Sequence, residues 1–215
     1  MNKINKIKLL IYCILFYIFT SLLTVAVTEN ISDREVNKES LYDFIHEITP
    51  VFPSQPTVTY FVYFFILYTV FRWGYFDLNK VSLFFFSLSV LYLLRLFTFT
   101  LTQTPPPRSK DNQWRVDHCK RTILSSFGIS LKKIGSSCVD NMFSGHASHI
   151  VVALTIILLY SKNKTEKFVL SLLGILSLIT VITGRLHYSS DVIVSMIISS
   201  LTVFFISKTF KVFSE

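Results

Sequence analysis

The chain has 215 residues, of which 51% are hydrophobic and only 16% are charged. Its mean hydropathy is +0.53, and a soluble domain of this length would lack the polar surface to cover so much apolar material. Six glycines and six prolines exclude a collagen-like chain, and the long apolar runs exclude intrinsic disorder. The net charge of +8 comes from Lys and Arg in short segments between apolar stretches, which favours membrane-surface loops over a nucleic-acid partner. The sequence therefore predicts an all-α integral membrane protein.

Six apolar stretches are long enough, or nearly so, to cross a bilayer as helices, which takes about 20 residues. They are residues 7–27, 57–71, 81–101, 142–160, 168–183 and 192–207. The second and fifth are short, so five or seven crossings are the alternatives. We expect a polytopic protein with six transmembrane helices.

The N-terminal segment carries Lys3, Lys6 and Lys8 at the start of an apolar run. The run is longer than the core of a typical signal peptide, which favours an uncleaved signal anchor. The densest clusters of Lys and Arg lie on the same side as this segment, so both chain ends are expected inside. Residues 1–56 are interpreted as the anchor helix and an outer loop with an interfacial helix, and residues 57–215 as a separate membrane domain.

Two outer loops are expected to contain short interfacial amphipathic helices. In the first, a capping-box-like start at Ser40–Asp43 precedes Phe44, Ile45 and Ile48. The second follows the Pro105–Pro107 run, which must end the third span, and has an apolar stripe over residues 123–134. Lysines and arginines oppose this stripe, and they either lie on anionic headgroups or meet a lipid phosphate. Cys119 and Cys138 share this loop, and an oxidising compartment would permit a disulfide between them.

Three ionisable residues near span ends are candidates for chemistry, because such groups are costly in a membrane. His146 opens the fourth span, His187 follows the fifth, and Asp191 begins the sixth. His187 and Asp191 are four residues apart, on one face if that turn is helical. The carboxylate would then accept a hydrogen bond from one ring nitrogen, so that the other nitrogen keeps its lone pair for the reaction.

The chain crosses the membrane twice between His146 and His187, so both histidines should return to one face. Two helices also begin on that face, and helix N-termini are natural seats for phosphate. A single His or Asp at a helix end is usually only interfacial polarity, but the combination favours a phosphoryl-transfer site. No Cys, His or Glu cluster has the spacing of metal ligands, so we expect neither a metal nor another cofactor. His149 is expected to be dispensable.

The motifs that carry these residues resemble a known family. Residues 138–146 (Cys-Val-Asp-Asn-Met-Phe-Ser-Gly-His), 187–192 (His-Tyr-Ser-Ser-Asp-Val) and 95–105 are similar to motifs of the sphingomyelin synthase family. That family is a branch of the lipid phosphate phosphatase superfamily. The similarity covers residues 95–205, about half of the chain, and the six-span layout matches as well. The resemblance implies that residues 57–215 are the catalytic membrane domain.

The resemblance implies transfer of a phosphorylated headgroup, most simply phosphocholine, from a glycerophospholipid to ceramide, with release of diacylglycerol. It implies that His187 is the nucleophile or general base, that Asp191 orients it, and that His146 is the acid. Arg95, Ser144 and Arg185 are the candidate substrate-binding residues; Arg95 either contacts phosphate or snorkels to the headgroups. Inositol and ethanolamine headgroups, a lipid phosphate phosphatase and a non-catalytic scaffold are the alternatives.

Two departures weaken the phosphatase alternative. Phosphatases of the superfamily carry a Lys-x6-Arg-Pro motif and an Arg six residues before the second His. Neither is present here, and Arg185 lies two residues before His187.

The family also implies a Golgi or plasma-membrane location with the site on the lumenal or exoplasmic face. The donor headgroup, the acyl preference, the organelle and the oligomeric state are left open by the sequence.

Overall fold

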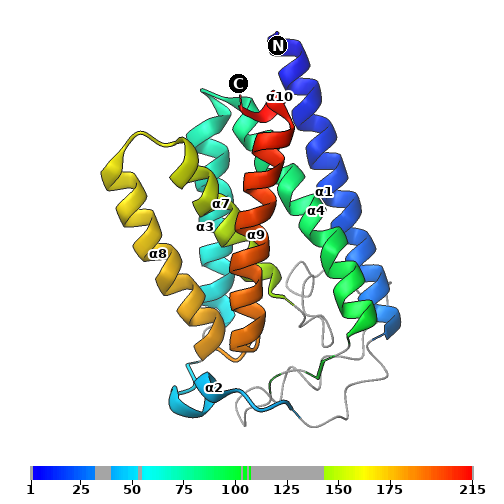
Figure 1. Cartoon of the computed structure of the whole chain (residues 1–215), viewed down its shortest axis with the longest axis vertical. Helices are drawn as coiled ribbons and strands as arrows, with labels where there is room; N and C mark the ends of the chain where they lie inside the picture. Colours follow the sequence, from blue (N-terminus) through cyan, green and yellow to red (C-terminus); the bar gives the residue numbers. More distant parts are fainter. Residues whose placement is uncertain are drawn as a thin grey trace.

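The computed structural model describes residues 2–31, 40–52, 55–102, 104–105, 107 and 143–214. Within these residues all regular structure is helical, which confirms the expected all-α class for this part of the chain. The helices are α1 (Lys3–Ile31), α2 (Phe44–Ile48), α3 (Gln55–Gly74), α4 (Leu78–Leu101), α7 (Gly145–Tyr160), α8 (Lys164–Thr183), α9 (Ser189–Thr209) and α10 (Lys211–Ser214). The long helices run side by side in one bundle (Figure 1).

Five of the six apolar stretches predicted as spans lie wholly within helices, and the fourth lies in α7 from Gly145 onward. Four helices in the described part are long and apolar enough to cross a membrane: residues 3–27 of α1, and the whole of α4, α8 and α9. Helix α7 is apolar but shorter. The four long helices support an integral membrane protein.

Helix α7 is the centre of the bundle. It packs against α3, α4, α8 and α9, and its residues Ile150, Val152, Ile156 and Ile157 are completely buried. Helix α1 packs mainly along α4, where Tyr17 meets the rings of Phe85 and Tyr92. A helix hydrophobic all round is suited to this central place.

Polar caps set where the helices begin. Asp77 caps α4 through the Asn79 N–H, and Asn163 caps α8 through the N–H groups of its first turn. The fourth span was expected from residue 142, but α7 begins at Gly145. Phe143 has a positive φ of 36°, which breaks the helical path, and Ser144 then caps the new start.

Both chain ends lie at one end of the bundle, and α2 lies at the other (Figure 1). The C-terminal helix α10, which we did not expect, is fixed by Lys80. The Lys80 Nζ donates to the carbonyl oxygen of Phe213 over 2.7 Å and lies 4.0 Å from the centre of the Tyr160 ring.

Residues 40–52, here called the strap, carry α2 across the end of the bundle opposite the chain ends (Figure 1). The expected interfacial helix forms, but its cap is Asp43 and not Ser40, because the Asp43 carboxylate accepts the N–H groups of Ile45 and His46. Leu41, Tyr42, Phe44 and Ile48 are exposed, as an interfacial segment requires. The amphipathic helix expected over residues 123–134 and the possible Cys119–Cys138 pair lie outside the described residues.

Candidate active site

The imidazoles of His146 and His187 are neighbours at the strap end of the bundle. Their ring centroids are 5.8 Å apart and their planes meet at 63°. His146 lies in the first turn of α7, and His187 lies between α8 and α9. His187 is 3% exposed and His146 is half-buried, so His146 is the more accessible of the two residues. An even number of crossings predicts this shared end.

Asp191 lies beside His187, although not through a helical turn as the four-residue spacing suggested. Helix α9 begins only at Ser189, so His187 precedes it. The Asp191 carboxylate turns back over the helix start, where Oδ2 accepts the N–H of Tyr188 over 3.2 Å and lies 3.9 Å from His187 Nδ1. This is the acidic half of a capping box. The capping geometry therefore brings the carboxylate to the ring.

Ser144 joins the starts of α7 and α9. It is fully buried, and its Oγ accepts the N–H of Ala147 as the cap of α7. Its own N–H donates to the Asp191 carbonyl over 3.2 Å, and its carbonyl accepts the Ser195 hydroxyl over 3.0 Å. These contacts hold the two helix starts, and with them His146 and Asp191, in one place.

Arg95 places a positive charge at the start of α7. It is 4% exposed, so it turns into the bundle and does not snorkel to the headgroups. Its guanidinium lies against Gly145 and near the rings of Tyr92 and Phe143. A guanidinium beside a helix N-terminus combines two favourable features for an anion.

Arg185 is bound to the strap. Its Nη2 donates to the carbonyl oxygen of Thr49 over 2.7 Å and to that of His46, and its Nη1 donates to Thr49 Oγ1 over 3.3 Å. Arg185 has a φ of 53°, a conformation that is strained for a residue with a side chain. The guanidinium therefore meets the carbonyl end of α2, where a cation is favoured.

Sequence reasoning missed the other contacts that fasten the strap over the turn between α8 and α9. Asp43 accepts the N–H and the hydroxyl of Ser189. The Tyr188 hydroxyl accepts the Leu41 N–H and donates to the Pro105 carbonyl. The available signal was an acid placed directly before an apolar helical run, which indicates a cap but not its second partner.

The charges of the strap are set by these contacts. Burial raises the pKa of Asp43, but hydrogen bonds from Ser189 and His46 outweigh it and hold the pKa below its usual value. Burial lowers the pKa of His46, helped by Arg185 and opposed by Asp43. At neutral pH the strap therefore carries an ionised Asp43 beside a neutral His46 ring.

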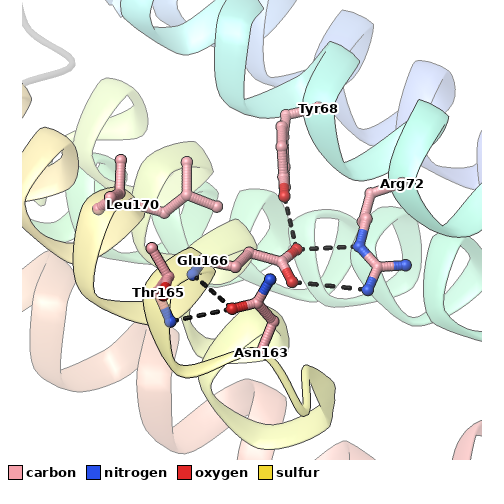
Figure 2. A pocket seen from close by; sticks show the side chains of 7 residues that line it. Tyr68, Arg72, Asn163, Thr165, Glu166 and Leu170 are labelled. Atoms are coloured by element: carbon pink, nitrogen blue, oxygen red, sulfur yellow. Dashed lines mark hydrogen bonds and ion pairs between the residues drawn. The ribbon is translucent and has the colours of Figure 1, made fainter.

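A separate pocket of about 470 Å³ lies at the other end of the bundle. Figure 2 shows Glu166 at its centre, accepting from Tyr68 and Arg72 of α3. Glu166 also accepts the Ser161 hydroxyl. These groups satisfy one another across three segments, so the cluster ties α3 to the turn between α7 and α8.

In the part of the chain that the structure describes, no three His, Cys, Asp or Glu side chains group closely enough to hold a metal ion.

Comparison with known proteins supports the resemblance seen in the motifs. Residues 137–209 match the family described as PAP2 superfamily C-terminal. This region contains His146, His187 and Asp191, and it covers α7, α8 and α9.

Curated relatives are similar over more of the chain. The phosphatidylcholine:ceramide cholinephosphotransferase 2 of Rattus norvegicus is 24% identical over 210 residues, covering 88% of this chain and 55% of the relative. A phosphatidylinositol:ceramide inositolphosphotransferase of Oryza sativa subsp. indica is 26% identical, covering 85% and 54%. The phosphatidylinositol:ceramide inositolphosphotransferase 2 of Arabidopsis thaliana is 30% identical over 130 residues, covering 54% and 39%. The chain thus spans about half the length, or less, of the curated relatives it matches. The expected similarity to the sphingomyelin synthase family is confirmed.

Proposed function

We propose, from the similarity of this chain to lipid phosphotransferases, that it transfers a phosphorylated headgroup from a glycerophospholipid to ceramide. The single observation that carries the proposal is the contact between the His146 and His187 rings, 5.8 Å between centroids, with Asp191 at 3.9 Å from His187. Two imidazoles and a carboxylate at one point supply a nucleophile, an acid and an orienting group.

In the first half-reaction, Nε2 of His187 attacks the phosphorus of the donor lipid. Asp191 faces Nδ1, so it holds the proton there and leaves the Nε2 lone pair available. The bond between phosphorus and the diacylglycerol oxygen breaks, and His146 gives its proton to that departing oxygen. Diacylglycerol leaves, and the headgroup phosphate remains on His187. The 3.9 Å contact is longer than a hydrogen bond, and we expect it to shorten as the ring becomes cationic.

In the second half-reaction, His146 acts as a base. It takes the proton from the primary hydroxyl of ceramide, and that oxygen attacks the phosphorus. The phosphorus–nitrogen bond to His187 breaks, which restores both histidines to their starting protonation. The same steps with water as acceptor would be hydrolysis, so exclusion of water decides between transferase and phosphatase.

Arg95 and the start of α7 form the proposed seat for the lipid phosphate. The buried guanidinium adds a fixed charge to the positive end of α7, in the same turn that carries His146. Ser144 contributes by capping that turn. Arg185 was expected to bind substrate; its bonds to Thr49 and His46 favour a role in which it acts through the strap.

Phosphocholine is the headgroup we propose first, and inositol and ethanolamine phosphates are the alternatives. Relatives named for choline and for inositol transfer match this chain at similar identity, so the headgroup has to be measured. We further propose that the helices α1, α3, α4, α7, α8 and α9 all cross the membrane, with both chain ends inside. The histidines then face the lumen or the exterior of a Golgi or plasma membrane.

The test uses the purified full chain in detergent with phosphatidylcholine, phosphatidylinositol and phosphatidylethanolamine, each labelled in the headgroup, with and without ceramide. Labelled sphingolipid that requires ceramide is the expected result, and the favoured donor identifies the headgroup. Release of a water-soluble labelled phosphate without ceramide would favour the phosphatase. A wild-type protein without any turnover, although well folded, would overturn the proposal and favour a scaffold.

A further inference from the structure

The carboxylate of Asp43 connects two helices that are far apart in the sequence. Oδ1 accepts the N–H groups of Ile45 and His46, over 3.0 and 3.2 Å, and thereby caps α2. The same carboxylate also binds the first residue of α9: Oδ2 accepts the Ser189 N–H over 2.6 Å, and Oδ1 accepts the Ser189 hydroxyl over 3.0 Å. Asp43 is 7% exposed, so water does not replace these bonds.

Ser189 lies between the two residues that must face each other in the proposed reaction. It follows Tyr188, whose N–H binds the Asp191 carboxylate, and it opens the turn from which Asp191 reaches His187. A shift of Ser189 therefore moves the Asp191 carboxylate relative to Nδ1 of His187.

Four donors converge on Asp43, and this number explains why a carboxylate is needed. An ionised carboxylate accepts through two oxygens with about four lone-pair directions, whereas an amide offers one accepting oxygen and a donating NH2. Asparagine could cap α2 through its one carbonyl oxygen. Its NH2 group would then occupy the position of Oδ2 and face the Ser189 N–H, which is also a donor. A serine hydroxyl could cap α2 but could not also hold Ser189.

We propose that Asp43 is a positioning residue for the headgroup transfer, fixing the start of α9 so that Asp191 faces His187. The proposal rests on the proposed function. Asp43 does not touch the reacting atoms; it acts through Ser189 and Asp191. A segment that precedes the catalytic helices by about a hundred residues thus completes their geometry.

The experiment compares Asp43→Asn and Asp43→Ser with the matched control Glu47→Gln, which removes an exposed carboxylate from the same short helix. We expect kcat to fall by about a hundredfold in both Asp43 variants, since a displacement of about 1 Å at a reacting group costs on the order of that factor. The KM for donor lipid should stay unchanged, and Glu47→Gln should behave as wild type. Asp43→Ser keeps the α2 cap, so it remains informative if Asp43→Asn fails to fold.

A second comparison separates positioning from general stability. In an Asp191→Asn background, Asp43→Asn should cause little further loss, because both changes disable the same contact. If the loss of kcat in the double variant equals the product of the two single losses, the proposal is overturned. A wild-type kcat in Asp43→Ser would overturn it as well. A wild type that makes no ceramide-dependent product would instead overturn the proposed function and, with it, this role. If the wild type transfers the headgroup and the Asp43 variants are as active, the positioning role of Asp43 is rejected and the proposed function stands.

Discussion

The guanidinium of Arg95 fills the space that a side chain at position 145 would need. A Cβ on Gly145 would lie 2.2 Å from Arg95 Nη1 and 3.0 Å from Cζ. The glycine therefore lets the cation approach the first turn of α7, beside His146. A substitution of Gly145 can therefore test the proposed phosphate-binding site without altering any ionisable group.

Gly145→Ala should weaken donor binding by displacing the Arg95 guanidinium. The clash falls on the movable end of a side chain, so the fold should survive. We expect a rise of KM for the donor of about tenfold, the equivalent of about 1.4 kcal/mol, close to the lower end of what a hydrogen bond to a charged group contributes. Gly74→Ala is the matched control, because nothing lies within 4 Å of a Cβ there. A donor KM equal to that of wild type would contradict the proposed role of Arg95.

His187→Ala should abolish transfer, and Asp191→Asn should lower kcat by about 10²–10⁴-fold, the range for loss of acid–base assistance. The first follows from the proposed role of His187 as nucleophile, and the second from the 3.9 Å contact between the Asp191 carboxylate and Nδ1 of His187. The measurement is ceramide-dependent product formation by protein whose melting temperature has been checked. Full activity in either variant would refute the assignment of these residues.

Lowering the pH should loosen the strap through His46. The pKa of His46 lies below its ordinary value of 6.5, so the docked strap favours the neutral ring. The stabilisation is complete above pH 6.5 and declines as the pH falls below it, because the released ring then binds a proton more readily. Hydrogen exchange over residues 40–52, corrected for its intrinsic pH dependence, should accelerate in acid. His46→Gln should remove this acceleration, and an equal acceleration in that variant would assign it to another group.

Tyr17→Phe should destabilise the fold while leaving the chemistry intact. His149 Nδ1 donates a hydrogen bond to the Gly145 carbonyl over 2.7 Å, so Nε2 accepts one from the Tyr17 hydroxyl over 2.8 Å. Loss of the hydroxyl leaves a buried ring nitrogen unsatisfied, at a cost of about 1–3 kcal/mol. Thermal unfolding should occur at lower temperature, with kcat per folded molecule unchanged. A selective loss of kcat would place His149 in the chemistry, against our expectation that it is dispensable there.

Glu166→Gln should act only on stability as well, at the other end of the bundle. The Glu166 side chain is 8% exposed and accepts from Tyr68, Arg72 and Ser161. Because the amide removes the charge from these bonds, we expect a loss of about 1–3 kcal/mol, read as a lower melting temperature. Transfer activity below that temperature should match wild type, and a specific loss of activity would indicate coupling between the two ends.

Hydropathy predicted the long helices, and crossing parity predicted that His146 and His187 lie at one end of the bundle, because these features follow from the order of apolar and polar segments along the chain. The nearness of the two rings depends on tertiary packing, and the short helix α10 was not expected. The four-residue spacing predicted the nearness of His187 and Asp191 for a different reason from the observed one. A helix start, with Tyr188 as its cap, brings the carboxylate back to the ring.

Long-range partners could not be predicted in the same way. Asp43 has the sequence context of an ordinary cap, and its second partner lies 146 residues away. Arg185 stands close to His187 in sequence, yet its guanidinium points to the carbonyl end of α2. The direction of a long side chain depends on which carbonyl groups tertiary packing brings near. The spacing of residues in the sequence does not predict those neighbours.

The division of labour between Asp43, Arg95 and the matched region limits how the protein can be trimmed or recombined. The PAP2-like stretch, residues 137–209, contains both imidazoles and the carboxylate but neither Arg95 nor Asp43. A minimal fragment cut to that stretch would keep the proposed reactive groups without the residues proposed to hold them and the substrate in position. Chimaeras with related transferases should therefore exchange α4 and residues 40–52 together with the C-terminal helices.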